Sequence, residues 1–156
     1  MTDLPAAFTL HRKGQWPRMA HGRVTLDYDA RFIRRKRLVT AQGEGFLIDL
    51  ADAVSLSDGD AFELADGRLI EIIALSEPVL VISGDLARLA WHIGNRHTPC
   101  QIEPQRLLIR DDHVLAAMLV GLGAQVEKSF EPFTPEGGAY GLGRTMGHSH
   151  DTPHII

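Results

Sequence analysis

The pattern of apolar residues changes near the middle of the chain, and this change limits the possible folds more than any other feature. Before residue 76, short apolar runs follow one another with turn residues between them, as in strand after strand. After residue 78, segments typical of strands and of helices alternate. These two patterns belong to different layer architectures. We therefore predict two domains, residues 1–76 and residues 77–143, within an α+β fold.

The first domain is expected to be a small all-β structure. Glycine-containing turns separate its apolar runs, and Asp66-Gly67 joins the last two in the way a two-residue hairpin does. A small antiparallel barrel or sandwich is the predicted architecture. The sequence indicates no structure for the segment that contains His11 and His21. The predicted strands lie at residues 24–28, 38–39, 46–50, 62–64 and 69–75.

The second domain is expected to follow the order β-α-β-β-α-β of a ferredoxin-like unit. The first helix is predicted from Asp85 to Ile93, with Ser83 or Asp85 as its cap and Gly94 as its stop. The second begins at about Asp112 and ends at Gly123, with residues 114, 115, 118, 119 and 122 facing inward. The predicted strands are residues 79–82, residues 100–103 and 106–109 as a hairpin that turns at Pro104, and residues 124–130.

A tail follows the second domain. Residues 135–143 are rich in glycine, and residues 144–156 are polar and contain three histidines, so we expect a flexible tail. The glycine-rich stretch lacks the Lys-Ser/Thr of a phosphate-binding loop.

Composition excludes several classes of protein. The formal net charge of −4 argues against a nucleic-acid binder, since only Arg34-Arg35-Lys36-Arg37 forms a basic run. That run would alternate sides on a strand, so we interpret it as a solvated edge that prevents β-aggregation rather than as a binding patch. The chain has neither a signal-peptide pattern nor an apolar stretch of the roughly 18 residues that span a membrane. A cytoplasmic protein with no membrane contact is expected, and its single cysteine, Cys100, cannot form an internal disulfide.

Histidine is the residue type that points to chemistry. The chain has eight histidines, and three of them, His148, His150 and His154, stand within the last nine residues. Neutral imidazole is the commonest protein ligand for borderline metal ions such as nickel, copper and zinc. The tail therefore suggests metal contact, and a solvated polar end is the alternative interpretation.

Two further histidines lie at predicted helix ends. His97 follows the first helix on a short loop that Pro99 stiffens, although a lone loop histidine is usually a surface residue. His113 opens the second helix after Asp111 and Asp112, where the helix dipole disfavours an imidazolium. At least one of the two aspartates is expected to cap that helix. Three other aromatic residues give less indication of a function. His92 is expected on the helix surface, and Trp16 and Trp91 are interpreted as packing residues.

The C-terminal half resembles the urease accessory proteins of the E type (UreE), which are nickel metallochaperones. The resemblance rests on residues 91–102 (WHIGNRHTPCQI), on residues 112–115 (DHVL) with Met118-Leu119, and on residues 132–141 (PFTPEGGAYG) before a histidine-containing tail. The order and spacing of these elements agree with the family, and the β-rich first half fits as well.

The resemblance implies a homodimer in which His97 of each copy meets across a two-fold axis to share one Ni(II) ion, with Zn(II) or Cu(II) as competing ions. It implies that His148 and His150, then His154, supply further nitrogens. Many family members carry a second histidine where this chain has Asp111, so an auxiliary site at His113 is less expected here. The implied partners are urease and its accessory proteins, including a GTPase, and the first domain is similar to a peptide-binding module.

Two other functions compete with metal delivery. A metal-dependent hydrolase would use His97, Asp111 and His113 to activate water, but the sequence offers no general acid or base beside them. An RNA-binding ferredoxin-like domain would need paired aromatic residues for base stacking, which this sequence lacks. We therefore predict that the chain is not an enzyme.

Overall fold

The computed structural model describes residues 3–137 of the 156-residue chain. It is a mixed α+β structure with two sheets and two helices in the described residues. The chain divides into two compact units, Met1–Leu75 and Ser76–Ile156, called unit 1 and unit 2 below. In the described part of the chain, neither helix is long and apolar enough to cross a bilayer.

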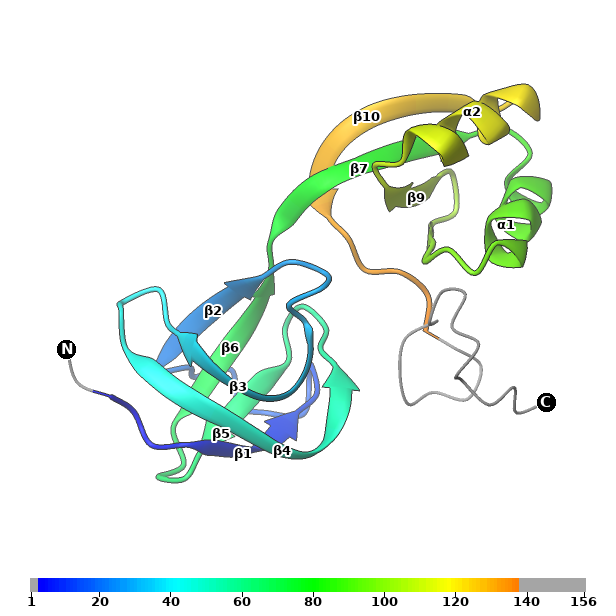
Figure 1. The fold of residues 1–156 in the computed structure, drawn as a ribbon. Coiled ribbons are helices and arrows are strands. Elements are labelled where there is room, and N and C mark those ends of the chain that lie inside the picture. Colours follow the sequence, from blue (N-terminus) through cyan, green and yellow to red (C-terminus); the bar gives the residue numbers. More distant parts are fainter. Residues whose placement is uncertain (1–2, 138–156) are drawn as a thin grey trace. The chain divides into compact units, whose positions relative to one another are not determined.

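Unit 1 is one strongly curved six-stranded sheet (Figure 1). The strand order in space is β2-β6-β5-β1-β4-β3, and a backbone hydrogen bond from Ala41 N to Arg23 O (2.9 Å) joins the end of β3 to β2. The sheet thus curls until its two edges touch at one point. Its strands are β1 (Ala7–His11), β2 (Gly22–Leu26), β3 (Phe32–Val39), β4 (Gly45–Ser55), β5 (Ala61–Leu64) and β6 (Leu69–Ala74).

The prediction of a purely antiparallel domain is wrong. Strand β1 pairs in parallel with β4, and β2 pairs in parallel with β6. The first of these pairs arises from the N-terminal segment, for which the sequence indicates no structure, because β1 inserts between β4 and β5. The β5–β6 hairpin is observed, but three residues, not two, separate its last pair, Leu64 and Arg68, and Gly67 takes the left-handed conformation (φ +91°) that this loop requires.

A buried carboxylate organises one end of the unit 1 core. Asp60 accepts hydrogen bonds from Lys13 N (2.9 Å), Ser57 N (2.9 Å) and Arg12 Nη1 (2.8 Å), and only 2% of its side chain is exposed. Trp16 is buried beside it and donates from Nε1 to Gly59 O (2.9 Å), as expected of a packing residue. Burial of a charge is tolerated here because every contact donates to it.

Unit 2 has the predicted β-α-β-β-α-β order (Figure 1). Its sheet has the spatial order β10-β7-β9-β8, with every neighbouring pair antiparallel. The two helices and the strands share one apolar core, which includes Leu80, Leu89, Ile109 and Leu119. Its elements are β7 (Ser76–Ser83), α1 (Leu86–Asn95), β8 (Gln101–Ile102), β9 (Leu107–Arg110), α2 (His113–Gly121) and β10 (Gln125–Pro132).

Two details of the helices differ from prediction. Asp85 caps α1 by accepting from Arg88 N (3.4 Å), but the helix continues through Gly94 to Asn95, so Gly94 is not its stop. In α2, Leu115 and Leu119 are buried as expected, whereas Val114 is 60% exposed. Residue 114 lies in the first turn, and its side chain is rotated by about 100° around the helix from that of Leu115, away from the core. Gly123 (φ +91°) closes α2, as predicted.

Candidate metal site

His97 sits directly at the C-terminal end of α1. Its backbone N–H donates to Gly94 O (2.9 Å), and Thr98 N donates to Ile93 O (3.4 Å). These two bonds satisfy carbonyls that the helix end would leave unpaired, in the pattern of a Schellman motif. In that motif the residue at the position of His97 is left-handed, and its φ is +57°. The side chain is exposed.

This backbone conformation is unusual for histidine. Glycine normally occupies the left-handed position after a helix, because a side chain there costs about 1 kcal/mol. The sequence contains a glycine close by, Gly94, but the helix passes through it. Strained residues of this kind cluster at functional sites. The sequence predicts His97 as a ligand candidate but not its strain, because Gly94 is the expected stop of the helix.

The segment that follows β10 is held beside β8, close in sequence to His97. Thr134 N donates to Gln101 Oε1 (2.9 Å), and Glu136 N donates to Cys100 O (2.9 Å). Phe133 is fully buried and anchors the start of this segment. The chain therefore enters residues 138–156 from a point next to the His97 loop. His148, His150 and His154 lie outside the described residues.

Cys100 lies next to this loop but does not supply a thiolate at neutral pH. Burial of its side chain, and to a smaller extent the nearby charge of Glu136, raises the pKa of the thiol to about 11. A protonated thiol is a poor metal ligand. The candidate donor of the loop itself is therefore the His97 imidazole, a ligand type that suits borderline ions such as nickel.

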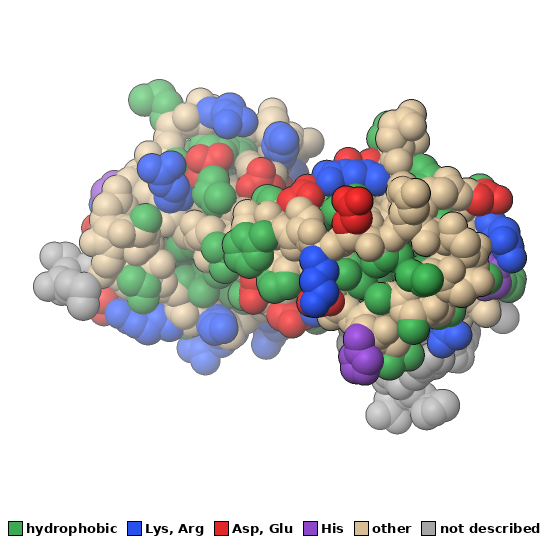
Figure 2. Space-filling view, turned by 90° about the horizontal axis from the view of Figure 1, so that it is seen from above, with side chains coloured by type: hydrophobic (Ala, Val, Ile, Leu, Met, Phe, Trp, Pro, Cys, Tyr) green, Lys and Arg blue, Asp and Glu red, His purple; other side chains and the backbone are tan. Residues whose placement is uncertain are grey.

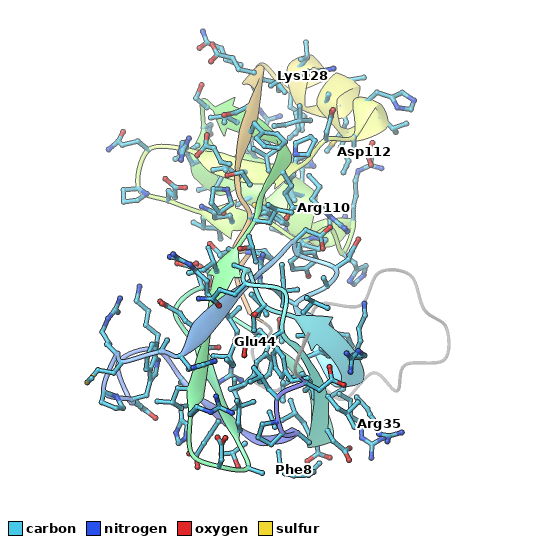
Figure 3. The ribbon with its side chains drawn as sticks, turned by 90° about the vertical axis from the view of Figure 1, so that its left-hand side faces the viewer. Phe8, Arg35, Glu44, Arg110, Asp112 and Lys128 are labelled. Atoms are coloured by element: carbon cyan, nitrogen blue, oxygen red, sulfur yellow. The ribbon has the colours of Figure 1, made fainter. Side chains whose placement is uncertain are left out.

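The second candidate group lies at the start of α2. Asp112 is the N-cap, since its Oδ1 accepts from Val114 N (2.9 Å) and Leu115 N (3.1 Å). Asp111 does not cap the helix, and its carboxylate lies 4.0 Å from Lys128 Nζ on β10. His113 is exposed at the first position of the helix. Figure 3 shows Asp112 at the start of α2 and Lys128 on the neighbouring strand.

The structure does not bring these candidates together within one chain. Within residues 3–137 there is no group of three or more histidine, cysteine, aspartate or glutamate side chains placed to hold one metal ion. His97, Asp111 and His113 are therefore separate positions rather than one centre. Figure 2 shows histidine side chains at the surface of unit 2.

The interpretation of Trp91 as a packing residue is wrong. Trp91 is 64% exposed on α1, the helix that ends two residues before His97. Its ring contacts that of His92 edge to face, with centroids 5.0 Å apart. The helix buries Leu89 and Ile93 instead, and Trp91 lies off that face. Helical spacing from these two residues would have indicated its exposure.

The histidines of unit 1 lie against carboxylates. His11 Nε2 lies 2.6 Å from Glu63 Oε1, and His21 Nε2 lies 2.9 Å from Glu44 Oε1. About a third of each histidine side chain is exposed. These histidines hold strands and loops together and form no part of the candidate site.

Comparison with known proteins assigns the family. The model of the UreE urease accessory protein C-terminal domain matches residues 77–155, and the model of the N-terminal domain of the same proteins matches residues 4–75. The chain belongs to the UreE family. The resemblance noted in the sequence is thereby confirmed.

Several curated UreE relatives are similar over most of their length. The urease accessory protein UreE of Rhodobacter capsulatus is 67% identical over 132 residues, which cover 85% of each chain. That of Cereibacter sphaeroides is 61% identical over 150 residues, 96% of this chain and 82% of the relative. That of Ruegeria pomeroyi is 62% identical over 149 residues, 95% of this chain and 99% of the relative.

The family consists of accessory chaperones in the maturation of urease, a nickel enzyme, and not of enzymes. This assignment confirms that the chain itself is not an enzyme. It decides against the hydrolase alternative, and the separation of His97 from Asp111 and His113 agrees with it.

Proposed function

We propose that this protein binds Ni(II) on exposed histidines at a site shared by two copies of the chain, and delivers the ion to urease while the enzyme's metal centre is assembled. The observation that carries the proposal is His97, an exposed histidine held at a strained helix end where glycine is the usual residue. Family membership supplies the metal and the recipient.

A homodimer gives the site its ligands. One copy brings no closed set of three donors within residues 3–137, whereas a two-fold axis through the loop would double His97 without further sequence. Trp91 supports this arrangement, because exposed tryptophans are enriched at the centres of protein interfaces. Unit 2, residues 77–143 in the sequence prediction, is therefore the proposed dimerisation and metal domain.

Residues 144–156 form the proposed tail, whose histidines add nitrogens to the shared ion. Residues 133–136 are held beside the His97 loop by hydrogen bonds. The eleven residues that follow residue 137, up to His148, can span roughly 35–40 Å when extended. His148 and His150 are the first candidates and His154 the next. His113 with Asp111 is at most a weaker auxiliary position, since a carboxylate is a harder ligand than imidazole. Zn(II) and Cu(II) compete for the same nitrogens.

The remaining assignments follow the family. Urease and its accessory proteins, including the GTPase, are the proposed partners, unit 1 (residues 1–76 in the sequence prediction) is the proposed partner-binding domain, and the cytoplasm is the proposed location. Neither nucleic acid nor membrane is a proposed partner.

Nickel titration tests the site, the tail and the dimer together. Calorimetry in buffers of different ionisation enthalpy, with mass measurement of the oligomer, is applied to the intact chain and to a chain truncated after Gly143. We expect one tightly bound Ni(II) per two chains, with weaker binding and release of fewer protons by the truncated chain. Equal proton release would exclude the tail, and one ion per monomer at unchanged affinity would exclude the shared site.

Delivery is tested separately. Nickel-loaded protein is mixed with apo-urease, and urease activity is followed against an equal concentration of free nickel in the presence of a competing chelator. Faster activation by the loaded protein is expected. Activation no faster than by the free ion would leave nickel binding intact but remove delivery from the proposal.

A further inference from the structure

Strand β3 forms an open edge of the unit 1 sheet (Figure 1). It pairs with β4 on one side, and in the described part of the chain it has no second neighbour. A register shift between Ile33 and Arg35 interrupts the pairing with β4, and the bond from Ala41 to Arg23 joins the two edges just beyond Val39. The regular open edge therefore runs from Arg35 to Val39.

Three cationic side chains occupy this edge, and they differ in how closely a carboxylate of the unit pairs with them. Arg35 is 63% exposed and lies 3.7 Å from Asp49, an exposed contact that contributes little. Lys36 forms no ion pair within residues 3–137. Arg37 is the exception, since it donates to Asp3 (2.8 Å). Figure 3 shows Arg35 at the margin of the ribbon, and Figure 2 shows basic side chains along unit 1.

Protection against aggregation explains part of this pattern, since charges on an edge strand prevent pairing with another copy. The same charges also select a partner. Two β3 edges would bring three cations from each chain together, whereas an acidic strand would meet opposite charge and unpaired backbone groups at once. The same positive charges thus oppose pairing with a second copy of this chain and favour pairing with an acidic strand.

We propose that the β3 edge from Arg35 to Val39 binds an extended acidic segment of a partner protein by strand addition. Main-chain hydrogen bonds from the open edge supply affinity, and carboxylates facing Arg35 and Lys36 supply selectivity. An apolar residue of the partner meets Val39, which is exposed at the end of the edge. Nucleic acid is a less suitable ligand, because the net charge of −4 repels a long polyanion. This inference does not depend on the nickel site.

The test uses the intact protein labelled with ¹⁵N and two synthetic eight-residue peptides, each with four consecutive valines and four consecutive residues of either glutamate or lysine, so that charged side chains reach both faces of the added strand. Binding of the glutamate peptide is expected to shift the amide signals of Arg35–Val39 and to slow their hydrogen exchange. The affinity should fall at least about fivefold between 50 and 300 mM salt. The lysine peptide should bind at least tenfold more weakly.

Charge reversal provides the decisive variant. In the R35E/K36E protein we expect the preference between the two peptides to invert. The R88E/K128E protein has the same change in net charge on two exposed positions of unit 2 and should keep the original preference. If R35E/K36E does not fold, the amide mapping and salt dependence of the unmodified protein decide the question.

Three results with the peptides would overturn the proposal, and so would a fourth with nucleic acid. They are no binding of the glutamate peptide, signal shifts centred on strands other than β3, and an unchanged preference in folded R35E/K36E. Tighter binding of a single-stranded oligonucleotide of equal charge would also overturn it, because the edge would then select a polyanion and not a strand.

Discussion

Histidines in unit 1 and unit 2 occupy contrasting positions. His11 and His21 lie against Glu63 and Glu44 at 2.6 and 2.9 Å, partly buried in the sheet structure. His97 and His113 are exposed and lie at opposite kinds of helix terminus, the first after α1 and the second opening α2. One residue type thus serves tertiary structure in one unit and is presented to solvent in the other.

The comparison shows how this chain separates stability from ligand binding. In unit 1 the buried carboxylate of Asp60 accepts hydrogen bonds from three donors, and this closed network stabilises the unit. Unit 2 instead carries a strained backbone at His97 with its ring at the surface. A closed hydrogen-bond network loses stability when one of its members is replaced, and it leaves no group to bind a ligand. An exposed side chain on a strained backbone can bind and release a ligand. Five predictions can break or sharpen this contrast.

The largest expected effect on stability lies in unit 1. Asp60→Ala removes the acceptor for three donors and leaves Arg12 and two backbone groups without it, so unit 1 should lose about 3 kcal/mol. Urea unfolding followed by Trp16 fluorescence in a Trp91→Phe background measures the loss. Nickel affinity, measured without urea so that the variant stays folded, should not change. A loss below 1 kcal/mol would show that the network is not needed.

The largest expected effect on binding lies in unit 2. His97→Ala should weaken nickel binding at least about 100-fold, or about 2.8 kcal/mol, because loss of an outer-shell partner alone costs up to 100-fold. His11→Ala is the matched control and should leave the affinity unchanged, since its ring pairs with Glu63. Calorimetric titration compares the two. Unchanged affinity in folded His97→Ala protein would remove His97 from the site.

Asp111 and Asp112 should differ although they are neighbours. Asp112→Ala is expected to destabilise unit 2 by about 1 kcal/mol, because it removes the acceptor for two helix N–H groups. Asp111→Ala should cost little, because its contact with Lys128 is a long surface ion pair. Ellipticity at 222 nm reports unit 2, since both described helices lie there. Equal losses would contradict the assignment of the cap.

Strain at His97 predicts a gain in stability on loss of function. His97→Gly should unfold at higher urea than His97→Ala, by about 1 kcal/mol, because only glycine is relaxed in the left-handed conformation. Both variants should bind nickel equally poorly. The same unfolding assay at 222 nm applies. If the alanine variant were as stable as the glycine variant, the backbone strain assigned to His97 would be absent.

The smallest expected effect depends on pH. Hydrogen bonds from Arg106 (2.7 and 3.0 Å), and then from Ser129, hold the pKa of Glu131 below its usual value. This contribution to stability is therefore present above about pH 4.3, the pKa in the unfolded chain, and is lost as pH falls through the lower folded pKa.

Glu131→Gln is thus expected to destabilise unit 2 by about 0.5 kcal/mol at pH 7, a small value because both side chains are partly exposed. The difference from the unmodified protein should shrink at pH 3. Urea unfolding at the two pH values measures it, and a deficit that grows on acidification would contradict the sign.

Much of unit 2 could be predicted because its signals are local. The order of strands and helices, the cap at Asp85 and the stop at Gly123 follow from spacing along the chain. His97 was also identified from the sequence as a ligand candidate. Unit 1 was less predictable, because the parallel pairing of β1 with β4 joins residues far apart in the sequence, and no local pattern encodes which strand lies between two others.

The sequence by itself determined the α+β class, the family resemblance and the choice of histidines as candidate ligands, since each depends on residue type and spacing. Only the tertiary structure decided that α1 passes through Gly94, which places His97 in the left-handed conformation, and that Trp91 faces solvent. It also decided that Asp112 rather than Asp111 caps α2. The physical reason is that core packing, and the partners available to the terminal backbone N–H and C=O groups, decide where a helix ends. Both depend on contacts with distant residues.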